Sequence, residues 1–445
     1  MAEKKTITSG RARRAIKMGG LASQVGSSYL WTSLRKPFLE AADYEREMLS
    51  THLKNARRIV ESSKQLRGAF MKLIQMLSTR NDLLPVEAID ILKTTQSSVP
   101  PMDYKLISKQ LRHELGKPPE QIFASFETEA FAAASLGQVH RARLKNGEEV
   151  AVKIQYPGVA ETVEHDLSNL KLLLRAMQRV VGDVMRQPID TKNIYAELEE
   201  RLREELDYIS ESRNVTEFGR LLADEPDVMV PRVIKELTTH RVLTMTYLDG
   251  YRLSDIFGEH GDLELRTWVA RKYYRLIWRQ ILEFGALHTD PQPGNYLVTY
   301  HPHLGILDFG SVRHFTDTVR RAYLHLAQSM LAGDDKGVAT ALFKLGYLDR
   351  GQDPAPLVRM IYVLFEPVII DRVYHPDEYD AVAKATEVSE MAFEHKLYKS
   401  PRHSIFLLRA LIGLDGIMKG LAVKTNYCTL FRKCIEDATR ANRAR

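Results

Sequence analysis

Residues 285–312 constrain this 445-residue chain more than any other stretch. They place Asp290 five residues before Asn295, and the triplet Asp308-Phe309-Gly310 begins thirteen residues after Asn295. Two carboxylates and an amide on neighbouring loops supply the oxygen ligands that Mg²⁺ prefers when nucleotide phosphates complete its shell. Either motif alone could occur by chance. Both together, in order, at hairpin spacing and behind an apolar helical run, predict a magnesium–nucleotide site.

The same order of residues is typical of protein kinases. In those enzymes the aspartate of the catalytic loop orients the attacking hydroxyl, while the downstream asparagine and the DFG aspartate hold the metal ions. The pattern therefore assigns the catalytic-loop position to Asp290 and the Mg²⁺ ligands to Asn295 and Asp308.

Lys153 lies in the segment VAVKIQ, which is typical of a central strand. A lysine that points inward from a strand is costly to bury unless it meets an anion. In kinases this lysine pairs with the nucleotide phosphates and with a helix glutamate. The alternative is a solvated strand lysine, but the magnesium loops downstream favour the functional interpretation.

Upstream of Lys153, the tract Ala132-Ala133-Ala134-Ser135 occupies the hairpin where kinases carry a glycine-rich phosphate loop. Small side chains let backbone N–H groups approach phosphates. Alanine narrows the φ/ψ freedom that glycine would allow, so we expect a stiffer loop. A tightly packed turn is the alternative.

The charge-rich segment REELDYISESRN, which contains Glu205, is expected to lie on one helix. Asp207 and Glu211 would then share a face at i, i+4. An acidic face without a basic partner on its own helix predicts an external cation, either Lys153 or another lysine. A solvated face is the alternative.

Composition sets broad limits. Apolar residues make up 44% and charged residues 27%, as in ordinary globular proteins. The two cysteines, Cys428 and Cys434, argue against a disulfide framework and are expected at unremarkable helix positions. No run of 18 apolar residues occurs, so no membrane-spanning helix is expected.

The net charge of +6 is unevenly distributed, because residues 1–36 are strongly basic with Glu3 as their lone acid. Residues 8–34 also show apolar side chains at helical intervals. A basic amphipathic helix can lie on an anionic membrane surface. A helix docked on the protein itself and a flexible tail are the alternatives, and a basic, acid-poor N-terminus also fits a mitochondrial presequence.

Periodicity predicts an α+β protein. Helices are expected over 38–115, 159–183 and 190–222, an antiparallel meander from 122 with its hairpin at Asn146-Gly147, and strands at 233–236 and 240–247. After Leu253 only helix is expected, apart from the loops at 288–310. This predicts a bilobal protein-kinase-like fold with a small β-rich N-lobe, a helical C-lobe and an added N-terminal helical extension. The expected parts are a basic segment 1–36, a helical extension 37–118, an N-lobe with a helical insertion 119–250 and a C-lobe 251–445.

With these residues in hand, the chain resembles the AarF/UbiB/ADCK family of atypical protein-kinase-like proteins over roughly residues 60–435. The resemblance is specific because it includes features that ordinary kinases lack. The matching stretches are FMKLIQMLSTRNDLLP at 70–85, AAASLGQVHRA at 132–142, VAVKIQYPGV at 150–159, ELDYISESRN, HTDPQPGN and DFG.

The resemblance implies a role for each matched position. Lys72 and Gln75 belong to a helical extension that folds over the active site, and Ala132–Ser135 cover the nucleotide. Lys153 pairs with Glu205, Asp290 takes the catalytic-loop position, and Asn295 and Asp308 hold Mg²⁺.

The resemblance also implies an activity and a setting. The implied cofactors are ATP and Mg²⁺, and ATPase activity is implied in place of protein phosphorylation. It implies support of ubiquinone or other isoprenoid-lipid biosynthesis. The expected partners are ATP, an isoprenoid lipid or quinone precursor, quinone-biosynthesis proteins and an anionic membrane surface, with no nucleic acid. The expected location is the cytoplasm or the periphery of an inner membrane, and the mitochondrion in a eukaryote.

Two positions depart from the family pattern. Ile74 replaces the motif glycine between Lys72 and Gln75, and Thr246 stands where an acidic residue is usual. The polar, basic C-terminus gives no reason to expect a C-terminal anchor. A nucleotide-gated scaffold or lipid-presenting protein remains the alternative. A conventional protein kinase is disfavoured, because the segment after DFG contains no A-P-E element.

Overall fold

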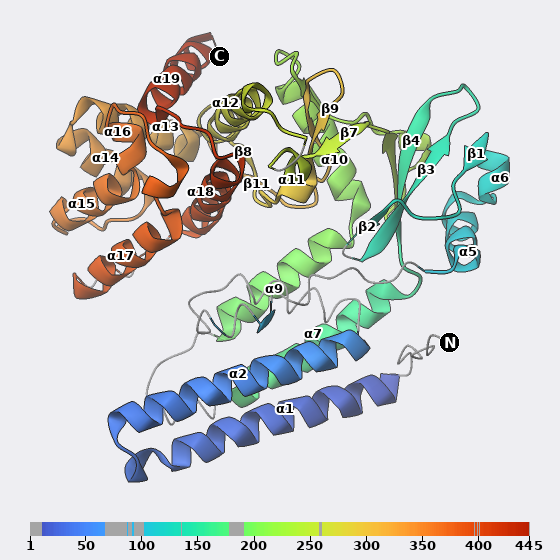
Figure 1. Cartoon of the computed structure of the whole chain (residues 1–445), viewed down its shortest axis with the longest axis horizontal. Helices are drawn as coiled ribbons and strands as arrows, with labels where there is room; N and C mark the ends of the chain where they lie inside the picture. Colours follow the sequence, from blue (N-terminus) through green and yellow to red (C-terminus); the bar gives the residue numbers. More distant parts are fainter. Residues whose placement is uncertain are drawn as a thin grey trace. The chain divides into compact units, whose positions relative to one another are not determined.

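The computed structural model describes residues 11–66, 87, 91–92, 102–134, 136–177, 191–257, 260–395, 397, 399 and 401–444 (Figure 1). The chain divides into two compact units. Unit 1 comprises Met1–Ser210 and Val233–Tyr247, and unit 2 comprises Glu211–Arg232 and Leu248–Arg445. The predicted roles of Lys72, Gln75, Ile74 and Ser135 lie outside the described residues. The domain boundaries drawn from the sequence stay predictions.

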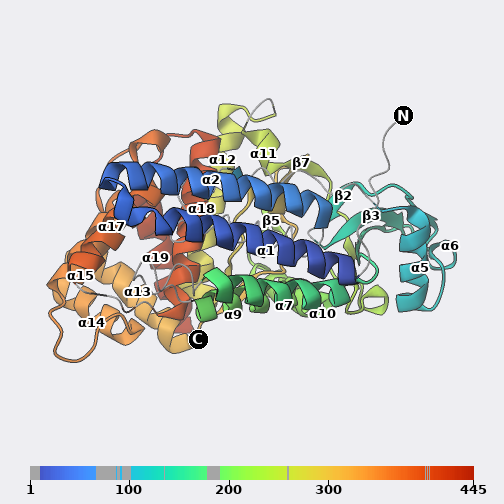
Figure 2. The same cartoon turned by 90° about the horizontal axis from the view of Figure 1, so that it is seen from below.

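Unit 1 begins with a helical hairpin. Helices α1 (Arg11–Leu34) and α2 (Ala41–Leu66) run side by side, joined through a 3₁₀ turn at Lys36–Phe38 (Figures 1 and 2). Leu21, Val25 and Tyr29 recur every four residues on α1 and are buried against α2. The apolar face of α1 therefore packs against the protein itself, as predicted by the alternative in which this helix docks on the protein.

The N-lobe sheet of unit 1 is antiparallel, with the strand order β1-β3-β4-β6 and β2 paired to β3. The predicted meander is thus confirmed, and its hairpin turns at Gly147, whose φ is +89°. The predicted strand at 233–236 is wrong. Only Val233 makes an isolated bridge, and Lys235–Leu237 form a 3₁₀ helix. The strands are β1 (Ser125–Phe126), β2 (Ala132–Ala134), β3 (Gly137–Arg143), β4 (Glu149–Gln155) and β6 (Val242–Thr246).

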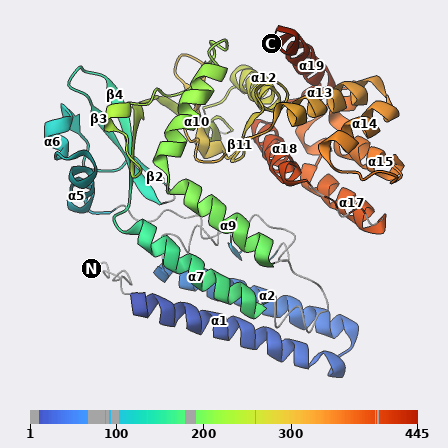
Figure 3. The ribbon, with the colours of Figure 1, turned by 180° about the vertical axis from the view of Figure 1, so that it is seen from behind.

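Helices cover the sheet and extend unit 1. One face of the sheet packs against Ile107 and Leu111. Helix α7 lies between α1 and α9 in the extension (Figure 3). The helices are α5 (Tyr104–Leu115), α6 (Pro119–Ile122), α7 (Val159–Met177) and α9 (Thr191–Glu205).

The single helix predicted over 190–222 is wrong, because α9 ends at Glu205 and α10 (Tyr208–Leu221) begins anew. Asp207 lies between them, and its Oδ1 accepts hydrogen bonds from the N–H groups of Ile209 at 3.1 Å and Ser210 at 3.3 Å. An aspartate in this position satisfies N–H groups that the first helical turn leaves without partners. Asp207 therefore shares no helical face with Glu211, and the side chain beside it is His240, at 3.0 Å, not a lysine.

Unit 2 contains short strands that the sequence did not predict. Four of them form a sheet in the order β5-β10-β9-β7, and β8 pairs with β11. These strands position the loops that carry Asp290 and Asp308. They are β5 (Val228–Met229), β7 (Gly250–Arg252), β8 (Ala286–His288), β9 (Tyr296–Thr299), β10 (Leu304–Ile306) and β11 (Val312–His314).

The rest of unit 2 is helical, as predicted. Cys428 and Cys434 lie in its last helix, buried and without a disulfide. Within the part of the chain that the structure describes, no helix is long and apolar enough to span a membrane. The helices are α11 (Leu253–Ile256), α12 (Leu263–Arg279), α13 (Asp317–Ala332), α14 (Asp335–Leu345), α15 (Ala355–Leu364), α16 (Glu366–Ile369), α17 (Ala381–Glu394), α18 (Arg402–Leu421) and α19 (Tyr427–Ala444).

Candidate functional site

A π-helix, Gln280–Phe284, leads from α12 into the predicted catalytic loop and ends at Gly285, whose φ is +68°. The buried Gln280 accepts a hydrogen bond from the backbone N–H of His288 at 2.7 Å. The ring of His288 in turn donates from Nε2 to the backbone carbonyl of Asp308 at 2.5 Å. Two buried side chains therefore fix the start of the Asp290 loop against the DFG loop. Such π-bulges are frequent at functional sites.

Asp290 and Asn295 face each other within one loop. The amide nitrogen of Asn295 donates to Oδ2 of Asp290 at 2.9 Å and to the backbone oxygen of Asp290 at 3.0 Å. Both bonds use the amide nitrogen, so the amide oxygen takes no part in them. That oxygen is the atom of an asparagine that can coordinate a cation.

The DFG loop brings a second carboxylate and a glycine close together. Oδ1 of Asp308 accepts the N–H of Gly310 at 2.8 Å. A Cβ added at Gly310 would lie 3.3 Å from Oδ1 of Asp308 and 3.9 Å from Oε2 of Glu211. The carboxylates of Asp308 and Glu211 therefore both lie beside Gly310, a residue without a side chain.

Burial raises the pKa of the Tyr296 hydroxyl, an interaction with Tyr273 lowers it, and the negative charges of Asp290 and Asp308 raise it further. The hydrogen bond from His288 to the carbonyl of Asp308 links the loops that carry these two aspartates.

Helix α10 holds the DFG backbone with residues that the sequence analysis did not single out for this role. Glu211 is only 3% exposed, Asn214 donates from Nδ2 to the backbone carbonyl of Phe309 at 2.8 Å, and the rings of Phe218 and Phe309 lie 5.2 Å apart. The spacing of 211, 214 and 218 puts the three side chains on one helical face. That spacing is visible in the sequence, but the partner that it faces is not.

Lys153 is buried in unit 1, as predicted for an inward-pointing strand lysine. Its side chain is on β4 between the neighbours Val139 and Leu243, and the residue is 8% exposed. Its Nζ lies 5.1 Å from the centre of the Tyr208 ring. The ring face attracts the cation. Glu205 is the last residue of α9 and is half-buried, and its pairing with Lys153 stays a prediction.

The alanine tract forms one strand of a hairpin. Ala132 pairs with Val139, and Ala134 pairs with Gly137. The hairpin is therefore where the sequence placed it, but the alanines are strand β2, and the chain turns after them. A Cβ at Gly137 would come within 2.2 Å of the backbone oxygen of Ile154, so only glycine fits between the hairpin and β4.

The predicted metal ligands in unit 2 are oxygen donors, the kind that Mg²⁺ takes in proteins. Among the described ranges, no group of three or more His, Cys, Asp or Glu side chains is placed to hold a metal ion. Mg²⁺ usually takes one or two carboxylates and completes its octahedral shell with waters and substrate phosphates. The carboxylate of Asp308 and the amide oxygen of Asn295 match that requirement.

Comparison with known proteins agrees with this geometry. The description "ABC1 atypical kinase-like domain" belongs to the family model that matches residues 94–342, which is more than half of the chain. The chain belongs to the ABC1 atypical kinase-like family. The predicted AarF/UbiB/ADCK resemblance and the predicted kinase-like fold are thereby confirmed.

Individual relatives of this ABC1 family member cover most of its length. The atypical kinase COQ8B, mitochondrial, of Rattus norvegicus is 32% identical over 415 residues, which are 92% of this chain and 77% of the relative. The uncharacterised protein sll1770 of Synechocystis is 31% identical over 402 residues, covering 89% of this chain and 67% of that protein. A solved structure, the complex of Rv3197 with erythromycin from Mycobacterium tuberculosis, is 25% identical with a TM-score of 0.57, and covers 88% of this chain and 97% of that one.

Proposed function

We propose that this ABC1 family member binds Mg·ATP and is a UbiB-type atypical kinase, an ATPase or small-molecule phosphotransferase that supports ubiquinone or other isoprenoid-lipid biosynthesis. The observation that carries the proposal is the hydrogen-bonded loop pair of unit 2. It holds Asp290 against Asn295 and ties both loops together through His288. The name of the rat relative, atypical kinase COQ8B, also supports a kinase-type activity.

In this proposal each site residue has one task. Asp290 orients the attacking oxygen, and Asn295 and Asp308 hold Mg²⁺, which neutralises charge on the phosphates. Lys153 contacts the phosphates, and Ala132–Ser135 cover the nucleotide. Glu205, Lys72 and Gln75 keep the roles that the family resemblance implies for them. Catalysis is then mainly positioning and electrostatic stabilisation of the transferring phosphoryl group.

The segment after the DFG triplet supports an activity other than phosphorylation of proteins. Strand β11 begins at Val312, and α13 already begins at Asp317. A conventional protein kinase needs a long activation loop between DFG and A-P-E. The short connection leaves no room for one, which is consistent with the missing A-P-E element.

The test is ATP turnover by the purified protein, wild type against Asp308→Asn. The substitution keeps the size of the side chain and removes the charge that holds Mg²⁺, so we expect turnover to fall roughly a hundredfold or more. The exposed Asp377, whose side chain is 83% exposed, provides the matched control Asp377→Asn, which should turn over ATP like wild type. Equal nucleotide binding and equal turnover in wild type and Asp308→Asn would refute the metal assignment.

A second proposal concerns a membrane surface and is favoured by the end of the α1–α2 hairpin. Trp31, Leu34 and Phe38 are 66%, 60% and 85% exposed there, beside the exposed Arg35 and Lys36. Apolar and aromatic side chains flanked by basic ones suit the interface of an anionic membrane. We call these five residues the hairpin tip. It would place the protein peripherally at an inner membrane, in the mitochondrion of a eukaryote, near a lipid or quinone precursor and its biosynthetic proteins. It would serve a nucleotide-gated scaffold or lipid-presenting protein equally well.

A further inference from the structure

Helix α18 contains three glycines, Gly413, Gly416 and Gly420. Glycine in the interior of a helix is less favourable than alanine, because it loses more conformational freedom on folding. For two of the three, a ring from another segment lies where a side chain would begin, namely Pro291 at Gly413 and Phe257 at Gly420. Gly416 is exposed, and among the described residues a Cβ added there would meet nothing within 4 Å.

The contact at Gly413 is the closest of these. A Cβ added at Gly413 would lie 1.9 Å from Cγ of Pro291 and 2.6 Å from its Cβ. Carbon atoms that are not bonded to each other pack at about 3.5–4.0 Å. A proline ring cannot rotate away, because it is closed onto the backbone nitrogen and fixes φ. Any side chain at position 413 would therefore displace either the helix or the backbone of Pro291.

Pro291 directly follows Asp290, and the backbone around it is closely hydrogen-bonded. The N–H of Gln292 donates to the carbonyl of Asp290 at 2.8 Å, and the N–H of Asn295 donates to the carbonyl of Gln292 at 3.0 Å. The side-chain amide of Asn295 also donates to Asp290, so residues 290–295 form one hydrogen-bonded turn. A shift of Pro291 would therefore move Asp290 and Asn295 as well.

The same face of α18 supports this loop at a second point. Gly420 lies seven residues after Gly413, about two helical turns further along. A Cβ added at Gly420 would lie 2.6 Å from Cε2 of Phe257. Phe257 directly follows α11, and α11 contacts the 3₁₀ turn Pro293–Asn295 at the end of the Asp290 loop.

Helix α18 is anchored near both of its ends. Near its start, Nε2 of His403 donates to the carbonyl of Leu345 at 3.1 Å, and Nδ1 of His403 lies 2.6 Å from the hydroxyl of Tyr323. At its end, the guanidinium of Arg266 donates to the carbonyl of Leu421 at 3.1 Å. We therefore expect the loop, and not the helix, to move when a side chain is added at position 413.

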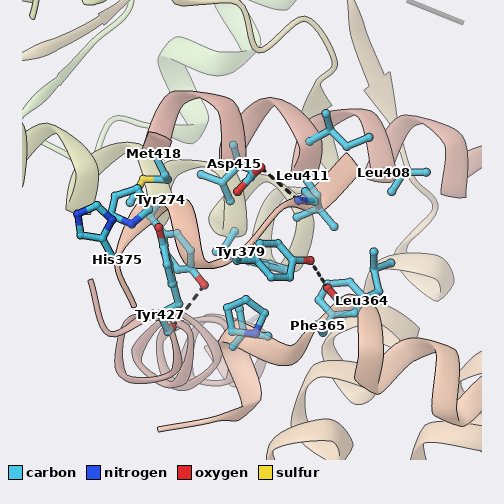
Figure 4. Close-up of a pocket in the computed structure, with 17 residues that line it drawn as sticks. Tyr274, Leu364, Phe365, His375, Tyr379, Leu408, Leu411, Asp415, Met418 and Tyr427 are labelled. Carbon is cyan, nitrogen blue, oxygen red and sulfur yellow. Dashed lines mark hydrogen bonds between the residues drawn. The ribbon is translucent and has the colours of Figure 1, made fainter. Parts of the chain in front are cut away.

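The opposite face of α18 is attached to another helix. At 3.6 residues per turn, the side chains on this face point away from Gly413. They line the pocket drawn in Figure 4 and are Leu408, Leu411, Asp415 and Met418. Asp415 accepts the N–H of Ala381 at 3.3 Å, at the start of α17. Helix α18 thus contacts α17 on one face and the Asp290 loop on the other.

We propose that Gly413 is a positioning residue, which makes room for the ring of Pro291 and thereby sets the place of Asp290. The inference rests on the proposed function, because it concerns the aspartate assigned to the attacking oxygen during ATP turnover. A misplacement of about 1 Å that arises away from the reacting atoms can lower a rate about a hundredfold.

Gly413→Ala tests this contact by adding one methyl group. We expect kcat for ATP turnover to fall about tenfold or more, with KM for ATP changed less, because Lys153 and Asp308 lie outside this loop. Gly416→Ala adds the same group to the same helix in open space and should keep the kcat of wild type. Circular dichroism at the assay temperature establishes that each variant is folded.

Pro291→Ala disrupts the same contact from the other side, because it removes Cγ and Cδ of the ring. Its kcat should fall about tenfold. The double variant Gly413→Ala with Pro291→Ala should lose no more than about twofold beyond Gly413→Ala, since both changes act on one contact. If Gly413→Ala does not fold, Pro291→Ala alone decides.

Hydrogen exchange without nucleotide separates this inference from the ATP assignment. In Gly413→Ala, peptides that contain Gln292 and Asn295 should exchange at least about threefold faster than in wild type, whereas Gly416→Ala should match wild type. If wild type does not turn over ATP, the proposed function fails, and exchange by the same variants still decides whether Gly413 holds the loop in place.

Four results would overturn the positioning role. They are a wild-type kcat or unchanged exchange in folded Gly413→Ala, an equal loss of kcat in Gly416→Ala, additive losses in the double variant, and a wild-type kcat in Pro291→Ala when Gly413→Ala does not fold.

Discussion

At the residue scale, the DFG backbone is held by two side chains that are not themselves expected to bind metal. His288 donates to the carbonyl of Asp308, and Asn214 donates to the carbonyl of Phe309. These bonds hold the two consecutive peptide units that follow Asp308 and Phe309, and so restrict the direction of the Asp308 carboxylate. A metal-binding aspartate must be placed within a fraction of an ångström to be effective. His288 and Asn214 are therefore expected to act as positioning residues.

Asn214→Leu tests this positioning. The substitution keeps the approximate size and leaves the buried carbonyl of Phe309 without a donor, which costs about 1–3 kcal/mol. We expect kcat for ATP turnover to fall about tenfold, with KM for ATP changed less, because the nucleotide contacts remain. Arg213→Leu, exposed on the same helix, should leave both constants unchanged. A loss confined to thermal stability, with kcat intact, would show that Asn214 has only a structural role.

The sequence predicted Asp290, Asn295 and Asp308 because they lie within one short stretch at a recognisable spacing. It did not predict Asn214, whose partner Phe309 is 95 residues away. A contact of that kind is set by tertiary packing, which leaves no local spacing to read. The burial of Lys153, in contrast, was predicted from local signals, namely the strand pattern and the apolar neighbours in VAVKIQ.

At the element scale, local turn chemistry separates the successful predictions from the wrong ones. Asn146-Gly147 specifies its hairpin by itself, because glycine adopts the positive φ that the turn needs. The break between α9 and α10 depends on the side chain of Asp207 acting as a helix cap, in a segment whose composition favours continuous helix. The strands β7 to β11 have only three or four residues, too few for an alternation to show.

The hairpin tip is an element-scale prediction as well. Trp31→Ala combined with Phe38→Ala should reduce binding to anionic vesicles, because it removes both aromatic rings of the hairpin tip. Flotation with vesicles of phosphatidylserine and phosphatidylcholine measures it, at low and high salt. Binding by wild type should weaken with salt, since screening reduces attraction between Arg35, Lys36 and the lipid charge. Phe393→Ala, at a ring 72% exposed in unit 2, is the control and should float like wild type. Unchanged flotation of the double variant would contradict the assignment.

At the scale of the whole molecule, both units contain histidines that burial keeps neutral. Burial lowers the pKa of His52 and His140 in unit 1 and of His403 in unit 2 from the ordinary value of 6.5. His140 donates from Nδ1 to the carbonyl of Glu127 at 2.8 Å, and its Nε2 lies 2.8 Å from Nε2 of Gln138. A second ring proton on His140 would leave two donors facing each other.

The sign of the pH dependence follows from these lowered values. Below pH 6.5 the unfolded chain binds protons that the folded chain does not, so the free energy of unfolding decreases as pH falls. Burial raises the pKa of Glu283 and of Asp415, and these two groups act in the opposite direction when they protonate. The carboxylates with lowered pKa values, such as Asp227 beside Lys272, lose their contribution only at lower pH.

We therefore expect the thermal midpoint of unfolding to decrease when the pH is lowered from about 7.5 to about 5.5, a range that spans the ordinary pKa of histidine. His140→Gln removes one of the groups that must stay neutral, so its midpoint should change less over the same range, even if it starts lower. His113→Gln, at an exposed position of α5, should follow the slope of wild type. Calorimetry at constant ionic strength measures all three. Parallel slopes for wild type and His140→Gln would mean that His140 can be protonated beside Gln138 without a loss of stability. The acid sensitivity of the protein would then arise from other groups.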